Sequence, residues 1–437
     1  MIYRFCAFLA IAGVLSMSSA ASTAQTLQSH EAITETSHFD PIPVPAFTLP
    51  DALVCNDGTR VTTAQQWVAK RRPELFSLFE KTVYGITPKK FESMTFTVEN
   101  VKKDARNGKA LRKEVVINFN GQPDGLKARV LIYVPNNRPA GKKVPAFLGC
   151  NFRGIHTITD ELDVTMTDAW VPNEPEKGRV NNKSTEASRG TSAARWPIDT
   201  VLDRGYALCS IYAGEIDPDF NDGFKNGVHA LVDPDKPRND QSWATISAWA
   251  WGLSCVLDYL QTDPDIDGTK VAVLGHSRLG KTALWAGAMD PRFAMVISND
   301  SGCGGAALYR RNVGETLDIM TGGLRYWFCE ELHKYKGRVM DLPFDMHELI
   351  ALQAPRPVYV ASASEDIWAD PKGEFFSVLG AVPVYELFGQ KPFNGVKDFP
   401  ECDKSVGSVM RYHVRTGKHN ITDFDWAQYL DFADKYL

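Results

Sequence analysis

Short runs of β-branched and aromatic residues recur along the chain and predict β-strands. The last four runs are apolar at consecutive positions, as in parallel strands buried on both faces, whereas the two runs before residue 144 are better interpreted as antiparallel. The runs are 115–119, 128–134, 144–148, 207–212, 271–274, 294–297 and 357–361, and the clearest helical stretches are 242–260 and 281–289. Strands followed by helices predict a three-layer α/β/α sandwich around a mostly parallel central sheet.

One polar stretch interrupts this alternation. Residues 155–198 contain few apolar side chains and are too long for an ordinary connection between elements. We expect them to form a surface insertion that helps to wall a substrate cleft. The whole of 51–437 is expected to be a single domain, preceded at 25–50 by an extended arm that is polar and then rich in proline.

The first residues have the pattern of a secretory signal peptide. Arg4 precedes the apolar run 5–15, and small residues follow as far as Ala24. The apolar run is too short to cross a membrane, and no later run approaches the roughly 20 apolar residues that a membrane helix needs. Cleavage after residues 1–24 predicts a soluble protein, secreted or periplasmic, without a membrane anchor.

Composition narrows the class of protein. The formal net charge is -5, with mixed signs along the chain, which argues against a nucleic-acid-binding protein because that class needs a basic stripe. The cysteines after the signal peptide include neither a CxxC pair nor a metal-like spacing. One or two disulfides and a set of buried thiols are both compatible with them, and the oligomeric state is left open.

The strongest chemical signal follows the predicted strand at 271–274. Residues 275–280, GHSRLG, connect this strand to a helical stretch, and they match the G-x-S-x-G nucleophile elbow with one extra residue before the second glycine. Such a strained turn holds the Ser277 hydroxyl above the sheet edge, with the amide of Arg278 placed to bind an oxyanion. A serine that caps a helix is the alternative, but the combined pattern favours a nucleophile and an α/β-hydrolase fold.

A nucleophilic serine needs a general base and a third group that orients the base. In hydrolases of this topology the order along the chain is nucleophile, acid, histidine. His419 lies in a turn-rich loop before a predicted helix at 423–436 and is the candidate base, whereas His413 has strand-like neighbours and is expected to be structural.

The acid is expected after one of two predicted parallel strands, where open α/β sheets place their sites. Asp300 follows the strand at 294–297, and Glu365 and Asp366 follow the strand at 357–361. A carboxylate from either location could orient the base.

Several segments resemble the glucuronoyl esterases, carbohydrate esterase family 15, and in particular its bacterial members. Residues 275–281, GHSRLGK, are similar to the G-x-S-R-x-G-K signature of that family. The resemblance spans most of the chain from about residue 145 onward. The other matching segments are GCNFRG at 149–154, AWAWGL at 248–253, DPDID at 263–267, DSGCGG at 300–305, EDIWADP at 365–371 and GKH at 417–419.

The resemblance implies a 4-O-methyl-glucuronoyl methylesterase, or glucuronoyl esterase. Its substrate would be the ester that joins glucuronic acid side chains of glucuronoxylan to lignin alcohols, a lignin-carbohydrate ester. Ser277 would attack the uronoyl carbonyl, and His419 would take its proton and later protonate the leaving alcohol. Arg278 would add its guanidinium to the oxyanion site.

The same resemblance implies three substrate-binding residues. Lys281 and Glu315 would form charge-assisted hydrogen bonds with sugar hydroxyls, and Trp368 would offer the sugar a flat apolar face. Each residue also has an ordinary structural interpretation: Lys281 and Glu315 as helix surface charges, and Trp368 as part of the core.

Two positions depart from the fungal members of the family. Those members carry a glutamate as the triad acid where this chain has Asp300, and many bacterial members carry the acid where Asp366 stands, so the two aspartates are expected to share or exchange the role. His276 replaces a cysteine that forms a disulfide in the fungal members, so that disulfide cannot form here. Its side chain is expected to point away from the pocket.

Two other functions compete with this interpretation. An acetyl xylan esterase, or another carbohydrate ester hydrolase, would use the same triad, but Arg278 and Lys281 together favour a uronoyl substrate. A non-catalytic polysaccharide-binding protein would have no need of an intact Ser277 and His419. His347 is followed by a glutamate but lacks the second histidine of a zinc helix motif. We therefore expect neither a metal nor an organic cofactor, because a triad with oxyanion donors suffices for ester hydrolysis.

Overall fold

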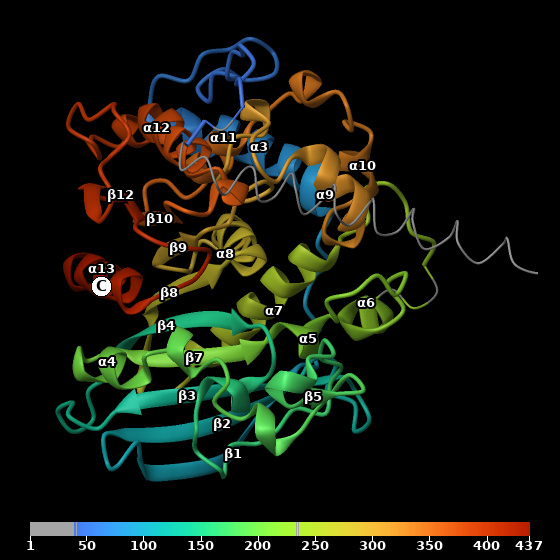
Figure 1. Ribbon diagram of the computed structural model, residues 1–437, viewed down its shortest axis with the longest axis vertical. Coiled ribbons are helices and arrows are strands. Elements are labelled where there is room, and N and C mark those ends of the chain that lie inside the picture. Colours follow the sequence, from blue (N-terminus) through green and yellow to red (C-terminus); the bar gives the residue numbers. More distant parts are fainter. Residues whose placement is uncertain (1–38, 41, 233, 235) are drawn as a thin grey trace, which may run out of the picture.

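The computed structural model describes residues 39–40, 42–232, 234 and 236–437 (Figure 1). The predicted signal peptide at 1–24, and with it most of the arm predicted at 25–50, lies outside the described residues. The described part of the arm rests on the domain, because Asp40 forms an ion pair with Arg311 at 2.7 Å. Within the described chain, no helix has both the length and the apolar character that a membrane crossing requires.

A ten-stranded sheet forms the centre of the molecule (Figure 1). The strands are β1 (Thr95–Ala105), β2 (Ala110–Asn118), β3 (Lys127–Pro135), β4 (Val144–Asn151), β7 (Ala207–Tyr212), β8 (Ile266–His276), β9 (Met295–Asn299), β10 (Val358–Ala363), β11 (Lys404–Gly407) and β12 (Met410–Arg415), and a separate hairpin pairs β5 (Arg179–Val180) with β6 (Lys183–Ser184). Their order is β1-β2-β3-β7-β4-β8-β9-β10-β12-β11. The five neighbouring pairs from β7 to β12 are parallel, and the other four pairs, towards the two ends, are antiparallel.

Helices cover both faces of this sheet (Figure 1). The α-helices are α2 (Ala64–Gln66), α3 (Arg72–Phe79), α4 (Ile198–Asp203), α5 (Ala213–Ile216), α6 (Gly227–Val232), α7 (Thr245–Leu260), α8 (Arg278–Met289), α9 (Leu317–Gly323), α10 (Glu330–His333), α11 (Met346–Ala351), α12 (Pro371–Leu387) and α13 (Asp423–Tyr436). Two π-helical segments, η1 (Trp67–Arg71) and η2 (Glu80–Tyr84), join α2 and α3 into one continuous helical run. The short 3₁₀ helices are η3 (Ile155–Ile158), η4 (Pro175–Lys177), η5 (Glu186–Ser188), η6 (Ala193–Arg195), η7 (Tyr309–Arg311), η8 (Arg325–Trp327), η9 (Val339–Asp341) and η10 (Ile367–Ala369).

The alternation of side chains along the strands divides the interior into two cores. In β8, Val271 and Val273 pack in the larger core with α7 and α8, whereas Ala272 and Leu274 face the second core, which α4 and α13 cover. Successive side chains of a strand point to opposite faces, so a strand that is apolar throughout requires cover on both sides. The predicted α/β/α sandwich is confirmed, with antiparallel strands at both ends of the sheet.

The seven predicted strands are all present, as are the helices predicted at 242–260, 281–289 and 423–436. The segment 155–198 adds no strand to the central sheet. It consists of short 3₁₀ helices and the β5–β6 hairpin, and Ile155, Ile158 and Val164 attach it to the second core. A segment of this kind lies over the sheet and leaves the arrangement of the central strands unchanged.

The cysteines are buried thiols in most cases. All seven cysteines of the described residues are unpaired, six of them are buried, and only Cys402 is exposed. Of the two interpretations left open by the sequence, the structure therefore supports buried thiols over disulfides. Burial raises the pKa of Cys150 and Cys209 above the ordinary range of a thiol, which keeps them protonated and unreactive.

Candidate active site

A strained turn holds Ser277 between β8 and α8. Ser277 has φ 59° and ψ -134°, a backbone conformation that residues with a side chain adopt only where the surroundings impose it. A Cβ at Gly275 would lie 1.8 Å from the carbonyl oxygen of Leu279, so only glycine fits there. The Ser277 amide donates to the carbonyl of Asn299 on β9 at 2.8 Å, and this bond fixes the turn to the neighbouring strand.

The sheet topology brings the predicted triad candidates together. Ser277 follows β8, Asp300 follows β9, Asp366 follows β10, and His419 lies in the loop after β12. These four strands are neighbours and run parallel, so their carboxyl ends meet at one edge of the sheet. The site therefore lies where open parallel sheets place their ligands.

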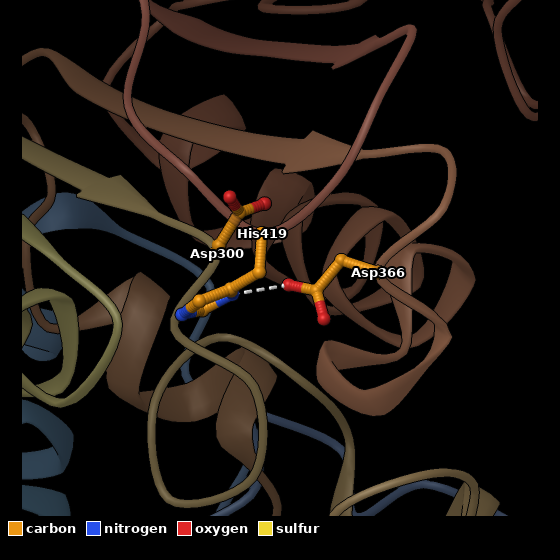
Figure 2. Close-up of side chains that lie close together, drawn as sticks. All are labelled: Asp300, Asp366 and His419. Carbon is orange, nitrogen blue, oxygen red and sulfur yellow. Dashed lines mark hydrogen bonds and ion pairs between the residues drawn. The ribbon is translucent and has the colours of Figure 1, made fainter. Parts of the chain in front are cut away.

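His419 is hydrogen-bonded to Asp366, with 2.5 Å between Nδ1 and Oδ2 (Figure 2). The Asp366 side chain is 4% exposed and that of His419 is 40% exposed, so a buried carboxylate orients an imidazole that faces the cavity. With Nδ1 engaged by the carboxylate, Nε2 is the nitrogen that remains for a proton from the serine.

Asp300 lies close by but does not bind the imidazole. In Figure 2 the dashed line from His419 runs to Asp366 alone, and Asp300 Oδ2 accepts a hydrogen bond from the Asn420 amide at 3.3 Å. Burial, with the nearby carboxylates of Asp366 and Glu374, raises the pKa of Asp300 well above its usual range, against the opposing charge of Arg415, whose Nη2 lies 3.7 Å from Asp300 Oδ2. Possible ligand atoms of Asp300, Asp366 and His419 lie within 4.8 Å of one another, but the short hydrogen bond gives them the arrangement of a base with its orienting acid.

His276 does not point away from the pocket, so that expectation is wrong. Its ring lies 4.5 Å from the ring of His419, centroid to centroid, and it lines the cavity. Its Nδ1 is 2.6 Å from Asn299 Oδ1, and this bond turns the ring towards the sheet edge on which His419 sits. Burial, together with the positive charges of His419 and Arg195, holds the pKa of His276 well below its usual range. Its neutral ring therefore packs beside the imidazole of His419.

Two cavities meet at Ser277, Arg278 and His419, which line both of them. We call them the Lys281 lobe, of 640 Å³, and the Arg195 lobe, of 490 Å³. The Lys281 lobe is also lined by Lys281, Asp300, Ser301, Gly302, Glu315, Trp327, Glu365, Asp366, Trp368, Ala369 and Lys418. The Arg195 lobe is also lined by Cys150, Phe152, Arg153, Glu174, Lys177, Arg179, Thr191, Ser192, Ala194, Arg195, Trp196, Leu274, Gly275, His276, Asn420, Ile421 and Trp426.

The three residues implied for substrate binding lie together in the Lys281 lobe. Lys281 Nζ donates to Glu315 Oε2 at 2.7 Å and to the carbonyl of Ser301 at 2.6 Å. The amide of Glu315 donates to the carbonyl of Trp368 at 2.7 Å. A Cβ at Gly314 would lie 2.4 Å from that same carbonyl, so the close approach of the two segments depends on this glycine. The lobe combines a fixed cation, a fixed carboxylate and an indole face.

The guanidinium of Arg278 is held by residues that the sequence did not single out. Its Nε lies 2.6 Å from Asp219 Oδ2, and its guanidinium carbon lies 4.7 Å from the ring centroid of Phe152. Asp219 Oδ1 in turn accepts hydrogen bonds from Tyr326 and from Trp327, at 2.9 and 3.0 Å. Asp219 belongs to a polar loop without a recognisable motif, so the sequence alone gave no signal for it.

The insertion supplies much of the Arg195 lobe. Glu174 accepts hydrogen bonds from Arg153, at 3.1 Å, and from Arg179, at 3.0 Å. Burial raises the pKa of Glu174, but the hydrogen bonds from Arg179 and Arg153 outweigh this effect and lower the pKa to about 2. Arg195 Nε donates to the side-chain oxygen of Asn420 at 2.8 Å. The wall of this lobe is therefore a set of charged groups.

Together these groups fit an acyl transfer. A strained serine, a histidine with its orienting carboxylate and an amide at the start of α8 lie at the junction of two cavities. An ester whose carbonyl is at Ser277 could place its acyl part in one lobe and its alcohol part in the other.

Comparisons with known proteins agree with this chemistry. A family model described as glucuronyl esterase, fungi, matches residues 238–389. A curated relative, carbohydrate esterase MZ0003 from an unknown prokaryotic organism, is 48% identical over 403 residues, which is 92% of each chain. A solved structure described as a promiscuous CE15 esterase from a marine bacterial metagenome is 47% identical, with a TM-score of 0.85 over 92% of this chain and 100% of the other. A glucuronoyl esterase structure from Solibacter usitatus is 43% identical, with a TM-score of 0.84 over 90% and 98%.

Proposed function

The chain belongs to the glucuronoyl esterases, carbohydrate esterase family 15, and is a carboxylic ester hydrolase of the serine type; from this we propose the substrate and the role of each site residue. The substrate is the ester that joins a glucuronic or 4-O-methylglucuronic acid side chain of glucuronoxylan to a lignin alcohol. The hydrogen bond between His419 and Asp366, beside a serine on a strained elbow, carries the proposal.

Acylation begins with attack by Ser277 Oγ on the uronoyl carbonyl carbon. His419 Nε2 takes the serine proton, and Asp366 stabilises the imidazolium that forms. The amide of Arg278, first in α8, and its guanidinium hold the negative charge that develops on the carbonyl oxygen. The bond to the alcohol oxygen then breaks, and that oxygen receives the proton from His419.

Deacylation repeats these steps with water as the nucleophile. His419 removes a proton from the water as it attacks the acyl-enzyme, and the same proton returns to Ser277 Oγ when the acyl bond breaks. The products are free enzyme and the uronic acid, which releases its carboxyl proton to water and becomes glucuronate. Every proton in the cycle passes through His419, so the reaction needs no metal ion or organic cofactor.

The Lys281 lobe suits the sugar ring of the acyl part. A uronate ester is neutral and carries hydroxyl groups, for which the Lys281 ammonium and the Glu315 carboxylate provide charge-assisted hydrogen bonds. Their side chains are 3% and 10% exposed, so both are already desolvated and fixed. Trp368 and Trp327 add apolar faces beside them. An acetyl group would leave this lobe unfilled, which favours the uronoyl ester over acetylated xylan.

Hydrolysis of methyl glucuronate and benzyl glucuronate, measured beside acetylated xylan, tests the proposal. We expect the wild type to release the alcohols and Ser277→Ala to lose at least about 10⁴-fold in kcat. Release of acetate alone would leave the triad in place but replace the substrate by an acetylated sugar. Release of neither product would favour a polysaccharide-binding protein that has lost catalysis.

The same substrate argues for export of the protein. A lignin-carbohydrate polymer cannot enter a cell, and residues 1–24 have the pattern of a signal peptide. We propose that the enzyme is secreted or periplasmic. Fractionation of producing cells, with N-terminal sequencing of the mature protein, tests this, and a cytoplasmic protein that begins at residue 1 would contradict it.

A further inference from the structure

The Arg195 lobe adjoins, at the nucleophile, the lobe whose groups are proposed to hold the sugar. If the uronoyl ring fills the Lys281 lobe, the alcohol oxygen must point towards His419, which donates the proton to it. His419, Ser277 and Arg278 line the Arg195 lobe as well. The remainder of the alcohol therefore extends into the Arg195 lobe, an assignment that rests on the proposed function.

The two lobes differ in charge. Five cationic side chains line the Arg195 lobe with Glu174 as its single carboxylate, whereas the Lys281 lobe has three cations and four carboxyl groups. Charges that line a cleft with low-dielectric walls focus the electric field within it. The Arg195 lobe is thus a cationic compartment next to a neutral ester site.

Arg195 is the cation of this lobe whose charge is least compensated. Arg153 and Arg179 share the carboxylate of Glu174, but among the described residues Arg195 forms no salt bridge, and its side chain donates to the neutral side chain of Asn420. Burial, with the charges of Arg153 and Arg278, lowers the pKa of Arg195. A bound anion would reduce the repulsion between Arg195 and these two guanidinium groups.

The same lobe offers aromatic surfaces for a flat ligand. Phe152 is half-buried and lies under the guanidinium of Arg278 at 4.7 Å, and Trp196 is 9% exposed at the wall. The indole of Trp426 donates to the backbone carbonyl of Arg195 at 3.0 Å, which fixes that segment. Aromatic side chains around a cation favour a ligand that has a ring and a negative group.

We propose that the Arg195 lobe binds the alcohol part of the ester and that Arg195 selects aromatic alcohols bearing a carboxylate. The guanidinium has a planar fork of donors that matches a carboxylate, and within the described chain no carboxyl group accepts a hydrogen bond from its Nη1 or Nη2. The ring of the alcohol lies near Phe152 and Trp196, with its carboxylate on Arg195.

Two esters of glucuronic acid that differ only in charge test the proposal. The alcohol is 4-carboxybenzyl alcohol in one and its neutral isostere, 4-carbamoylbenzyl alcohol, in the other, and the 3-substituted pair covers the second ring position. For the wild type at low salt we expect kcat/KM to be about tenfold higher for the carboxylate. The preference should decline as NaCl is added, because salt screens the charges.

Substitutions of Arg195 test whether the preference for the carboxylate ester depends on this one side chain. Arg195→Gln should bring the ratio of the two kcat/KM values close to one, and Arg195→Lys, which keeps the charge without the fork, should retain part of it. Arg204→Gln removes an arginine that is 36% exposed and pairs with Asp434 on the surface, and it should keep the full preference. If Arg195→Gln does not fold, Arg195→Lys and the salt dependence of the wild type decide.

Methyl glucuronate separates this inference from the proposed function, because its alcohol is too small to reach Arg195. Hydrolysis of methyl glucuronate without a preference between the charged and neutral benzyl esters would overturn the inference alone. A preference that survives in Arg195→Gln would also overturn it. Failure to hydrolyse any glucuronate ester would overturn both.

Discussion

The Lys281 lobe and the Arg195 lobe share three residues but are built from different parts of the chain. The Lys281 lobe comes from the segments that follow the neighbouring strands β8, β9, β10 and β12, and its central ion pair, Lys281 with Glu315, is almost fully buried. The Arg195 lobe comes in large part from the segment 155–198, and its ion pairs are more exposed, with Glu174 at 25% and Lys177 at 53%.

The different origin of the two lobes assigns the catalytic groups to the core of the fold and recognition of the alcohol to a segment that can vary. Groups on core strands are fixed by the packing of the whole sheet, so a serine, a base and a sugar site built there keep their geometry. An insertion over the sheet can change in length and charge without disturbing the core. We infer that the acyl specificity of this enzyme is set by the hydrolase core and its alcohol specificity by the insertion.

The largest expected effect concerns the two aspartates near the nucleophile, Asp366 and Asp300, which both belong to the hydrolase core. Asp366 binds His419, whereas Asp300 accepts a hydrogen bond from the Asn420 amide and lies 3.7 Å from the Arg415 guanidinium. Asp366→Asn should lower kcat for methyl glucuronate by about 10³-fold or more, because an amide favours the wrong tautomer of the base. Asp300→Asn keeps the size of a side chain that makes no hydrogen bond to the imidazole, so it should lower kcat by less than about tenfold. The reverse order of the two effects would make Asp300 the triad acid.

The pH dependence of stability should differ in sign between the two lobes. Glu374 is buried behind the Lys281 lobe and accepts hydrogen bonds from the amides of two lining residues, Ser301 and Gly302, at 2.8 and 2.9 Å. Burial raises the pKa of Glu374 to about 7, above its value in the unfolded chain. The folded state therefore holds this proton more tightly, and the stability that results is lost as the pH rises from about 4.5 to about 7. Glu174 has a lowered pKa, so its stabilisation is present above about pH 4.5 and is lost towards pH 2.

Urea unfolding between pH 4.5 and 8 measures this effect. For the wild type, Glu374 should make the free energy of unfolding fall by about 3 kcal/mol over that range, and in Glu374→Gln this component should be absent. The same substitution at the exposed Glu401, whose pKa is lowered by Lys404, should give a profile parallel to that of the wild type above pH 5. A constant difference between wild type and Glu374→Gln across the range would show that Glu374 is ionised when buried.

Local patterns in the sequence predicted the core-built part of the site. Consecutive apolar residues predicted β8, β9 and β10, and the glycines around Ser277 predicted a turn that only those residues allow. The order along the chain then restricted the base to the histidines after Ser277, and the turn-rich loop before a predicted helix selected His419 among them. Each of these signals lies within a few residues of the group it predicts, which is why a single sequence was enough.

The rest of the site depends on contacts between distant segments. Asp219 meets Arg278 only through the fold, and the choice between Asp300 and Asp366 depends on which carboxylate the loop after β12 reaches. His276 was expected to point away from the pocket, but it is the last residue of β8, where the strand gives way to the elbow, and its ring lies against that of His419. The local sequence does not fix the direction of a side chain at such a boundary.

The smallest expected effect gives the sharpest test, because it asks whether the two lobes act independently. Glu315→Gln should lower the ratio of kcat/KM for methyl glucuronate to that for a small acetate ester by about tenfold, since a charged hydrogen bond to the sugar becomes a neutral one. It should leave the preference between the 4-carboxybenzyl and 4-carbamoylbenzyl esters in place. Effects at sites without shared partners usually add. The double variant with Arg195→Gln should therefore lose both preferences by the factors of the single variants, and a marked departure would mean that the residues at the junction couple the lobes.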